Sequence, residues 1–340
     1  MKINFILPFK RMSGGIRVVY IYANYLAEQG HEVCCYVPML SYRGKGQSIL
    51  FRIKASLSNI IKKENWFDCK FPVKIVPLIR ENFIEDADVV IATAWQTAFD
   101  VNKLSEKKGR KYYFIQDYEV FNGNVSDVEK TYSLGINMIT ISKKLQSKLL
   151  NFSNDVSIVY NGLYDSEYIR GEKKHLNKFT IMLMYHEAEH KCTTEGLEVI
   201  RKIKEKYDNI QIIIFGRKIN EKFDEDYIVE ESPEREKLME LYQMADVYLF
   251  TSKIEAWGLP IVEAMANKCA VIGRKIGALY ELYDGKNAII ANDINEMYGA
   301  LEVLYKNRLC LYKIQDAAYC TAKKLSWKKS AQKFESIILK

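Results

Sequence analysis

Short apolar runs alternate with helix-like segments along most of this 340-residue chain. Brief apolar runs between turn residues are typical of buried strands, whereas apolar positions repeating at the helical period are typical of helices that face a core. In the first half, strand-like runs occupy residues 2–8, 31–38, 74–79, 88–94, 111–116, 137–142 and 156–162, and helical patterns occupy residues 16–28 and 95–104. This order of strand, turn, helix and strand predicts a parallel sheet.

The same alternation restarts after a turn signal at Asn161-Gly162. Strand-like runs follow at residues 179–185, 210–216, 246–252, 269–275 and 287–291, with helical patterns at residues 194–207, 234–244 and 325–339. A chain of this length is long for one hydrophobic core and comfortable for two. The pattern therefore predicts an α/β protein with two parallel-sheet domains.

Composition narrows the class of protein. Hydrophobic residues make up 48% of the chain, charged residues make up 27%, and the formal net charge is +7. The seven cysteines include no C-x-x-C pair, so neither a disulfide framework nor a structural zinc site is expected. The amino-terminal apolar run is too short for a secretory signal, and no segment approaches the roughly 18 apolar residues of a membrane span. These features predict a globular cytoplasmic protein.

Residues 43–63 interrupt the alternation by mixing basic and apolar residues. At helical spacing the apolar side chains gather on one side and most basic side chains on the other. Two interpretations remain open: a helix that packs on the core with a solvated basic face, or a basic amphipathic helix that lies on an anionic membrane. The second would make the protein peripheral at the inner face of the membrane.

The densest candidate site lies in a strand-loop-helix pattern ending in residues 251–267, TSKIEAWGLPIVEAMAN. Pro260 suits the first helical position, because its missing N–H is one that a helix start leaves unpaired anyway. The amino end of such a helix attracts anions, and Gly258 lets a bulky anion approach the backbone. Glu255 and Glu263 would flank a phosphate there and repel it, unless each grips a neutral group. Sugar hydroxyls meet that requirement.

This stretch resembles the family 4 retaining glycosyltransferases, which have the GT-B fold. The resemblance rests on the spacing E-x7-E with an internal G-L-P, followed by E-A-M-A. It implies that Glu255 faces the donor sugar, that amides near Gly258 and Leu259 meet the diphosphate, and that Glu263 holds the ribose hydroxyls. The alternative is an ordinary strand-loop-helix that carries two glutamates by chance.

Two further stretches extend the resemblance over nearly the whole chain. Residues 13–33 resemble the start of the family, whose glycine pair lies at the interdomain cleft, so Gly14 and Gly15 are implied in donor binding. The alternative is that these glycines only turn the chain. Residues 276–285 resemble the segment that closes the donor domain of the family, with Gly277, Glu281 and Gly285 in place.

The resemblance implies a GT-B architecture of two Rossmann-like domains facing across a cleft. Residues 1–165 would bind the acceptor, residues 166–322 would bind the nucleotide sugar, and residues 323–340 would form a helix that returns to the first domain. The G-x-G-x-x-G pattern of dinucleotide enzymes is absent, which argues against a nicotinamide cofactor. No cofactor is expected, because the nucleotide diphosphate sugar is a substrate.

Residues 186–190, HEAEH, match the H-E-x-x-H pattern of zinc peptidases. That chemistry needs both histidines one turn apart on a helix, with the glutamate activating a metal-bound water. Here a strand-like run abuts His186 and the next helical pattern begins only near Thr194, so His186 and His190 are expected on a loop. A zinc hydrolase therefore remains an alternative function, and a chain with no metal site is the favoured prediction.

In the family, the same strand is usually followed by an arginine and, five positions later, by a lysine, which together neutralise the diphosphate. Lys191 falls on the lysine position and His186 on the arginine position, while Cys192 replaces the usual glycine. A histidine is a weaker, pH-dependent cation, although it could still donate a hydrogen bond to a phosphate oxygen. The resemblance thus implies catalytic roles for Lys191, His186 and Glu255.

Polar residues also follow the strand-like run at residues 111–116. The ligand crevice of an open α/β sheet lies outside the carboxyl ends of its strands, so Gln116, Asp117 and Glu119 are candidates for acceptor contacts. Many family members carry a histidine in this region, and this chain has none. The alternative is that Asp117 or Glu119 caps the next helix.

The resemblance as a whole implies a metal-independent, retaining glycosyltransferase. It would move a hexosyl or deoxyhexosyl group from a nucleotide diphosphate sugar to a hydroxyl of a glycan or lipid-linked acceptor, in cell-surface polysaccharide synthesis. No nucleic-acid partner is expected. Besides the zinc hydrolase, a non-catalytic GT-B subunit that binds nucleotide sugar remains open, because His186 and Cys192 depart from the family pattern.

Overall fold

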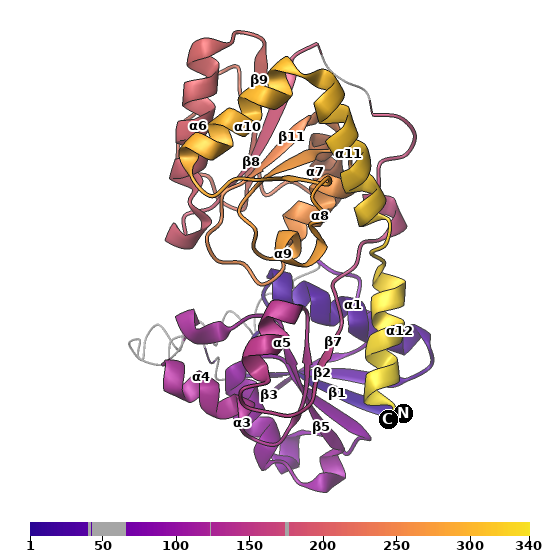
Figure 1. Cartoon of the computed structure of the whole chain (residues 1–340). Coiled ribbons are helices and arrows are strands. Elements are labelled where there is room, and N and C mark those ends of the chain that lie inside the picture. The colour runs from indigo at the N-terminus through magenta and orange to yellow at the C-terminus, as the bar shows by residue number, and fades with distance from the viewer. Residues whose placement is uncertain (40–41, 43–65, 123, 174–176) are drawn as a thin grey trace. The chain divides into compact units, whose positions relative to one another are not determined.

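The computed structural model describes residues 1–39, 42, 66–122, 124–173 and 177–340 (Figure 1). It contains two compact units, and the chain passes from the first to the second and back. Unit 1 comprises Met1–Asn161 and Trp327–Lys340, and unit 2 comprises Gly162–Ser326. The predicted basic amphipathic helix at residues 43–63 lies outside the described residues.

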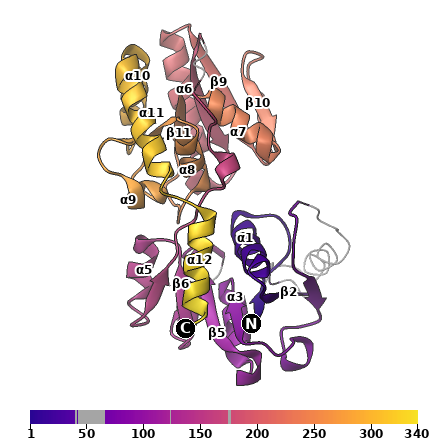
Figure 2. The same ribbon diagram turned by 90° about the vertical axis from the view of Figure 1, so that its right-hand side faces the viewer.

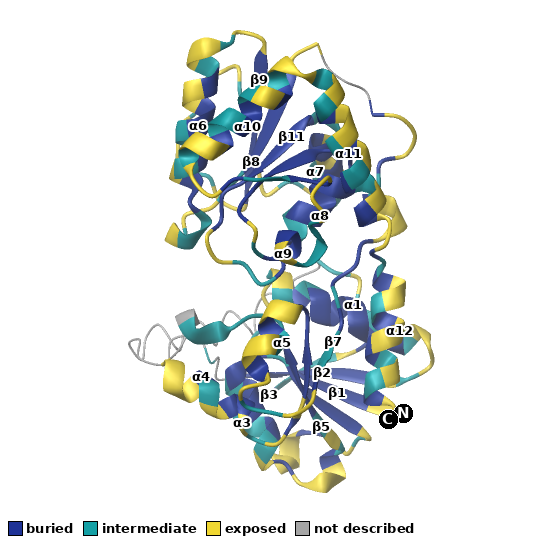
Figure 3. Ribbon diagram, in the orientation of Figure 1, coloured by how far each residue is buried: buried dark blue, intermediate teal, exposed yellow. Residues whose placement is uncertain are grey.

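Unit 1 is built on a seven-stranded parallel sheet with the strand order β3-β2-β1-β4-β5-β6-β7. Its strands are β1 (Lys2–Ile6), β2 (Glu32–Pro38), β3 (Val73–Val76), β4 (Val89–Ala92), β5 (Arg110–Ile115), β6 (Asn137–Thr140) and β7 (Val156–Ile158). The central strands are buried along most of their length (Figure 3). Parallel sheets are covered on both faces, so such strands appear in the sequence as near-continuous apolar runs.

The last helix of the chain packs on unit 1. The ring of Phe334 stacks on Tyr22 with 4.7 Å between centroids and meets Phe114 edge-on at 5.4 Å. This places α12 beside α1 (Figure 2). The helices of the unit are α1 (Gly14–Glu28), α3 (Trp95–Lys103), α4 (Val125–Tyr132), α5 (Lys143–Leu149) and α12 (Trp327–Ile338), with the 3-10 helices η1 (Glu81–Phe83), η2 (Glu106–Lys108) and η3 (Glu119–Asn122).

The start of α1 differs from the sequence prediction. The pattern places Gly14 and Gly15 in a loop, whereas the structure places them in the first turn of the helix. Ser13 explains the difference: its backbone is extended, and its hydroxyl accepts a hydrogen bond from the Ile16 N–H at 3.3 Å. This is the usual N-cap arrangement, and it starts the helix before the first apolar position of the periodic pattern.

Unit 2 contains a six-stranded parallel sheet with the order β10-β9-β8-β11-β12-β13. Its strands are β8 (Phe179–Tyr185), β9 (Ile210–Gly216), β10 (Ile228–Glu231), β11 (Val247–Phe250), β12 (Ala270–Gly273) and β13 (Ile289–Ile290). Its helices are α6 (Thr193–Lys206), α7 (Arg235–Met244), α8 (Leu259–Ala266), α9 (Ala278–Leu282), α10 (Ile294–Lys306) and α11 (Arg308–Ala322), with the 3-10 helices η4 (Asp165–Glu167) and η5 (Glu189–Lys191).

The two parallel sheets confirm the predicted α/β class, and each predicted strand-like run overlaps an observed strand. Within the part of the chain that the structure describes, no helix has both the length and the apolar character needed to span a bilayer.

Candidate active site

Three loops of unit 2 carry His186, Lys191, Glu255 and Gly258 of the predicted site, together with Gly277. They follow β8, β11 and β12, which are neighbours in the sheet. Parallel strands end on the same edge of a sheet, so the loops at residues 186–192, 251–258 and 274–277 lie together outside the carboxyl ends of these strands. That edge is where open α/β sheets bind their ligands.

Lys191 and Glu255 meet across two of these loops. Lys191 ends η5 after β8, Glu255 lies after β11, and the ammonium and carboxylate form an ion pair. Their side chains are 16% and 19% exposed, so the pair is shielded but reachable from solvent. The Lys191 backbone is held as well, because the Thr251 hydroxyl donates to its carbonyl at 2.7 Å. The structure thus brings together the predicted leaving-group cation and the predicted sugar-facing carboxylate.

Gly258 shapes the amino end of α8. It is the N-cap residue, in the left-handed region with φ +78°, and Pro260 is the second helical residue, one position later than the sequence predicts. A Cβ at position 258 would lie 3.0 Å from both Glu255 Cγ and Ile261 Cδ1, so conformation and space both require glycine. The Ile261 N–H already donates to the Gly258 carbonyl at 3.0 Å. The predicted amides of Gly258 and Leu259 remain the candidates for an anion.

Gly277 holds the third loop against the second. Its φ is +55° and its ψ is −134°, and a Cβ there would lie 2.5 Å from the Trp257 carbonyl oxygen. The Ala278 N–H donates to the same carbonyl. Close approach of two backbones therefore requires this glycine, and the contact supports the loop that carries Glu255.

His186 is tied into its loop by three hydrogen bonds. Its N–H donates to the Thr193 hydroxyl oxygen at 3.0 Å, its carbonyl accepts from that hydroxyl at 2.8 Å, and its Nδ1 accepts from the Ala188 N–H at 2.9 Å. The last bond puts the proton of the neutral ring on Nε2. Burial, with the positive charges of Lys191 and His190, lowers the pKa of His186. At neutral pH the ring is therefore a hydrogen-bond donor rather than a cation.

The zinc-peptidase interpretation of residues 186–190 lacks the helix that it needs. β8 ends at Tyr185 and η5 spans only Glu189–Lys191, so His186 and His190 do not share the face of an α-helix. Across residues 1–39, 42, 66–122, 124–173 and 177–340, no group of three or more His, Cys, Asp or Glu side chains is placed to hold a metal. The geometry gives this alternative no support.

Glu263 lies on the buried side of α8 and is 3% exposed. Its Oε1 pairs with Arg235 Nη2 at 2.7 Å, and its Oε2 accepts from the Tyr242 hydroxyl at 3.3 Å. Arg235, the first residue of α7, also pairs with Glu167 at 2.6 Å. Both carboxylate oxygens of Glu263 thus have partners within the protein, and a ribose contact remains a prediction.

In unit 1, Gln116 joins the end of β5 to the start of α1. Its Nε2 donates to the Gly15 carbonyl at 3.0 Å, so a predicted acceptor-side residue and a predicted donor-side residue are neighbours, with Gly14 next in the chain. The Asp117 Oδ1 accepts from the Tyr118 N–H at 2.7 Å, which keeps that carboxylate in its own turn. Contact of these residues with an acceptor stays a prediction.

Glu119 supports α3, the helix that precedes it in the chain, rather than the next one. Its Oε2 accepts from the Trp95 N–H at 2.7 Å and from the Tyr113 hydroxyl at 3.3 Å. The N-cap position of α3 holds Ala94, which has no side-chain acceptor, so Glu119 supplies one. Burial raises the pKa of Glu119 to about 7, against the lowering effect of the Trp95 N–H.

The structure adds residues that the local patterns did not single out. Arg274 follows β12 and pairs with Glu195 of α6, which lies 79 positions away. Arg235 bridges Glu167 and Glu263. Spacing rules link residues within one helix or loop, so pairs this distant in the chain gave no sequence signal beyond the position of Arg274 directly after a strand.

Known sequences resemble part of the chain, mainly unit 2. Residues 165–313 match the family model described as glycosyl transferases group 1. The trehalose synthase of Thermococcus litoralis is 29% identical over 119 residues, covering 29% of this chain and 29% of the relative. The trehalose synthase of Pyrococcus horikoshii is 28% identical over 130 residues, covering 33% and 31%. The matched segments span less than a third of these curated relatives.

Solved structures match the chain over nearly its whole length. HepE of Anabaena, in complex with UDP and glucose, has a TM-score of 0.74 at 12% identity and covers 99% of both chains. Sucrose-phosphate synthase of Thermosynechococcus elongatus has a TM-score of 0.72 at 13% identity and covers 99% and 98%. WaaG, a glycosyltransferase involved in lipopolysaccharide biosynthesis, has a TM-score of 0.68 at 13% identity and covers 99% of both. The chain therefore has the GT-B fold, and residues 165–313 match the family model of the glycosyl transferases group 1.

Proposed function

We propose that this protein is a family 4 retaining glycosyltransferase. It transfers a hexosyl or deoxyhexosyl group from a nucleotide diphosphate sugar to a hydroxyl of a glycan or lipid-linked acceptor. The observation that carries the proposal is the Lys191–Glu255 ion pair beside the amino end of α8. A cation, a carboxylate and helix N–H groups at one sheet edge suit an anionic leaving group attached to a neutral sugar.

The reaction breaks the bond between the anomeric carbon and a diphosphate oxygen, and the electron pair leaves with the diphosphate. The acceptor oxygen bonds to the anomeric carbon, and its proton passes to the departing diphosphate. As negative charge grows on the diphosphate, the Lys191 ammonium turns from Glu255 to the leaving group, which reaches the pair from its solvent-accessible side. Together with amides near Gly258 and Leu259, it stabilises the leaving group. Glu255, once released, accepts hydrogen bonds from sugar hydroxyls.

His186 takes a supporting part in this scheme. Because its Nδ1 is engaged by the Ala188 N–H, its Nε2–H is the group available to donate to a phosphate oxygen. It stands where the family usually has an arginine, and it contributes a neutral hydrogen bond instead of a full charge. Lys191 then carries most of the neutralisation of the diphosphate.

The comparisons support the class of donor and the kind of product. HepE was solved with UDP and glucose, and WaaG is a glycosyltransferase involved in lipopolysaccharide biosynthesis. The family match covers the half of the chain in which Lys191 and Glu255 lie. A nucleoside diphosphate sugar as donor and a cell-surface glycan as product agree with these relatives.

The decisive experiment compares wild type with Lys191→Ala in slow hydrolysis and transfer assays on a panel of UDP, GDP and dTDP sugars, with and without EDTA. We expect wild type to release nucleoside diphosphate regardless of EDTA, and Lys191→Ala to lose about 100-fold or more in rate, as when one charge-stabilising donor is removed. Lys202→Ala, which removes an exposed lysine paired with Glu198 on α6, serves as the matched control. Full activity of Lys191→Ala would refute the scheme, and activity lost with EDTA would revive the zinc hydrolase.

A non-catalytic subunit that binds nucleotide sugar is the second candidate. Cys192 favours it, because it replaces the usual glycine of the family at a position where the backbone has a left-handed φ of +51°. His186 in the arginine position points the same way. Wild type that binds a nucleotide sugar tightly but turns over none of the panel would select this candidate.

A further inference from the structure

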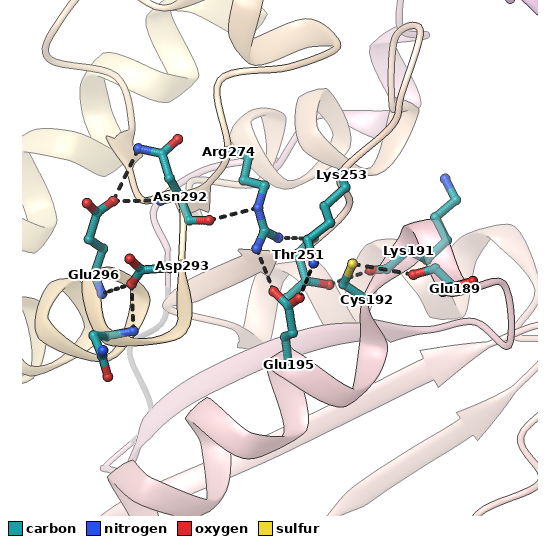
Figure 4. A network of polar contacts seen from close by, with 11 residues as sticks. Glu189, Lys191, Cys192, Glu195, Thr251, Lys253, Arg274, Asn292, Asp293 and Glu296 are labelled. Atoms are coloured by element: carbon teal, nitrogen blue, oxygen red, sulfur yellow. Dashed lines mark hydrogen bonds and ion pairs between the residues drawn. The ribbon is translucent and has the colours of Figure 1, made fainter.

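Behind Lys191 lies a connected group of residues that we call the Arg274 network, namely Glu195, Thr251, Lys253, Arg274 and Asn292 (Figure 4). Its members come from the first turn of α6, from the loops after β11 and β12, and from the segment before α10. Thr251 contacts Lys191 at its main-chain carbonyl and not at its ammonium. The network instead joins the three loops of the site from behind.

Arg274 is the centre of the network. It is 9% exposed, and each nitrogen of its guanidinium has a partner: Nη2 pairs with Glu195, Nη1 donates to the Thr251 carbonyl, and Nε donates to the Asn292 carbonyl at 2.9 Å. The planar fork fixes the relative positions of these three partners, which a lysine could not do. The loop after β11 is therefore held in one place relative to α6.

Glu195 completes the connection. Besides Arg274, it pairs with the Lys253 ammonium. Although burial opposes it, hydrogen bonds from Lys253 and Arg274 lower the pKa of Glu195, so the carboxylate is charged at neutral pH. The segment 251–253 is thus attached at both ends, through the carbonyl of Thr251 and through the side chain of Lys253.

That segment in turn holds the backbone of Lys191. The Thr251 hydroxyl donates to the Lys191 carbonyl at 2.7 Å, and the Lys253 N–H donates to the His190 carbonyl at 2.8 Å. Arg274 is therefore two hydrogen bonds away from the Lys191 main chain. A buried ion pair adds little to stability compared with apolar residues of similar volume. The directional hydrogen bonds of such a pair do fix the position of a functional group. When every supporting hydrogen bond is made, the group is held within about 0.5 Å of its working position.

We infer that Arg274 and Glu195 are positioning residues for transfer. Through Thr251 and Lys253 they fix the main chain at positions 190 and 191, and with it the reach of the Lys191 ammonium toward the diphosphate. The inference rests on the proposed function, because it takes Lys191 as the group that meets the leaving diphosphate. Neither residue needs to contact the substrate.

The first test measures kcat and KM with the nucleotide sugar that wild type uses best. For Arg274→Met we expect kcat to fall about tenfold to a hundredfold, the size expected when a reacting group moves by roughly 1 Å. Glu195→Gln should also lower kcat, but by less. This variant keeps the test available if Arg274→Met does not fold. Arg274→Lys should fall between wild type and Arg274→Met, because it keeps the charge toward Glu195 but loses the fork.

The second test is a double-mutant cycle that needs no turnover. It measures the Kd of whichever of UDP, GDP and dTDP binds wild type most tightly, for Arg274→Met, Lys191→Ala and the double variant. If Arg274 acts through Lys191, its substitution weakens binding about tenfold alone and by no more than about twofold once Lys191 is gone. A purely structural role gives the same fold-change in both backgrounds.

Arg308→Met is the matched control. Arg308 also pairs with a buried carboxylate in unit 2, that of Asp246, which directly precedes β11 at the opposite edge of the sheet. Its loss should lower the Tm without changing kcat or Kd. Two results with an active wild type would overturn the inference and leave the proposed function standing. One is that Arg274→Met and Glu195→Gln both keep the wild-type kcat. The other is that Arg274→Met and Lys191→Ala have additive effects on the Kd. A wild type with no nucleotide binding and no turnover overturns the proposed function itself.

Discussion

Replacing Glu119 with glutamine should remove a pH-dependent loss of stability from unit 1. In the folded protein, burial raises the pKa of Glu119 to about 7 from an ordinary value of 4.5. Between these values the folded state binds more protons than the unfolded state, so the free energy of unfolding falls as the pH rises through this window. Glutamine has the same shape, keeps an oxygen for the Trp95 N–H and does not titrate.

The size of the effect follows from the two pKa values. Linkage with pKa values of about 7 and 4.5 gives a contribution of roughly 2 to 3 kcal/mol at pH 5 and nearly zero at pH 8. The difference between wild type and Glu119→Gln should therefore change by roughly 2 to 3 kcal/mol across this range. Most of the change should fall below pH 7.

Urea unfolding at pH 5, 6, 7 and 8, followed by hydrogen exchange of peptides from α3 and β5, reports the stability of unit 1 separately from that of unit 2. The Tyr113 hydroxyl donates to Glu119 and lowers its pKa, so Tyr113→Phe should extend the downward slope to higher pH. Parallel curves for wild type and Glu119→Gln would show that burial does not raise the pKa of Glu119, and the linkage argument would be wrong.

Three further predictions test other parts of the molecule. At position 186, asparagine can replace the Nδ1 acceptor and glutamine can replace the Nε2 donor. If the Nε2 donor matters, steady-state kinetics should show the larger loss of kcat for His186→Asn. If only the bond from the Ala188 N–H to Nδ1 matters, the larger loss should be for His186→Gln. Gly277→Ala meets a backbone oxygen at a positive φ and should lose about 2 kcal/mol of stability and weaken nucleotide binding. In contrast, Gly299→Ala, which has open space on α10, should gain about 0.5 kcal/mol in the same urea titration. Lys173→Met leaves buried carbonyls at Ala245 and Asn267 without their donor and should cost about 3 kcal/mol in thermal or urea unfolding, whereas equal stability would refute a clamp on the ends of α7 and α8.

The apolar pattern predicted the parallel strands well because both faces of each central strand are covered. β8 and β9 occur at the predicted residues without any shift. β10 escaped prediction for the opposite reason: it pairs only with β9 at the sheet edge, and its sequence, IVEE, alternates intermediate and exposed positions. An edge strand with one solvated face has no continuous apolar run for a sequence pattern to detect.

The candidate site divides in the same way. Gly258 and Gly277 were predictable because a conformation or close contact that only glycine tolerates leaves a local mark in the sequence. Arg235 and Arg274 were not, since each ties together segments that only the folded sheet brings near. The tautomer of His186 was also beyond the sequence, because it depends on the Ala188 N–H.

The two glutamates of the E-x7-E spacing show how the fold resolves an electrostatic conflict. Carboxylates beside a phosphate seat would repel a diphosphate, and the sequence suggested that neutral hydroxyls relieve this. The structure adds a cation to each: Lys191 for Glu255 and Arg235 for Glu263. The first pair is reachable from solvent, so a diphosphate can replace Glu255 as the partner of Lys191.

The second pair behaves differently, because both carboxylates that Arg235 holds, Glu167 and Glu263, are almost completely buried. Removing its cation would leave uncompensated buried charge, which costs about 3–5 kcal/mol. Arg235 is therefore fixed, while the Lys191 ammonium can change its partner. The two glutamates of the E-x7-E spacing thus have different roles. The Glu255–Lys191 pair can open for a diphosphate, and the Glu263–Arg235 pair keeps α8 in place.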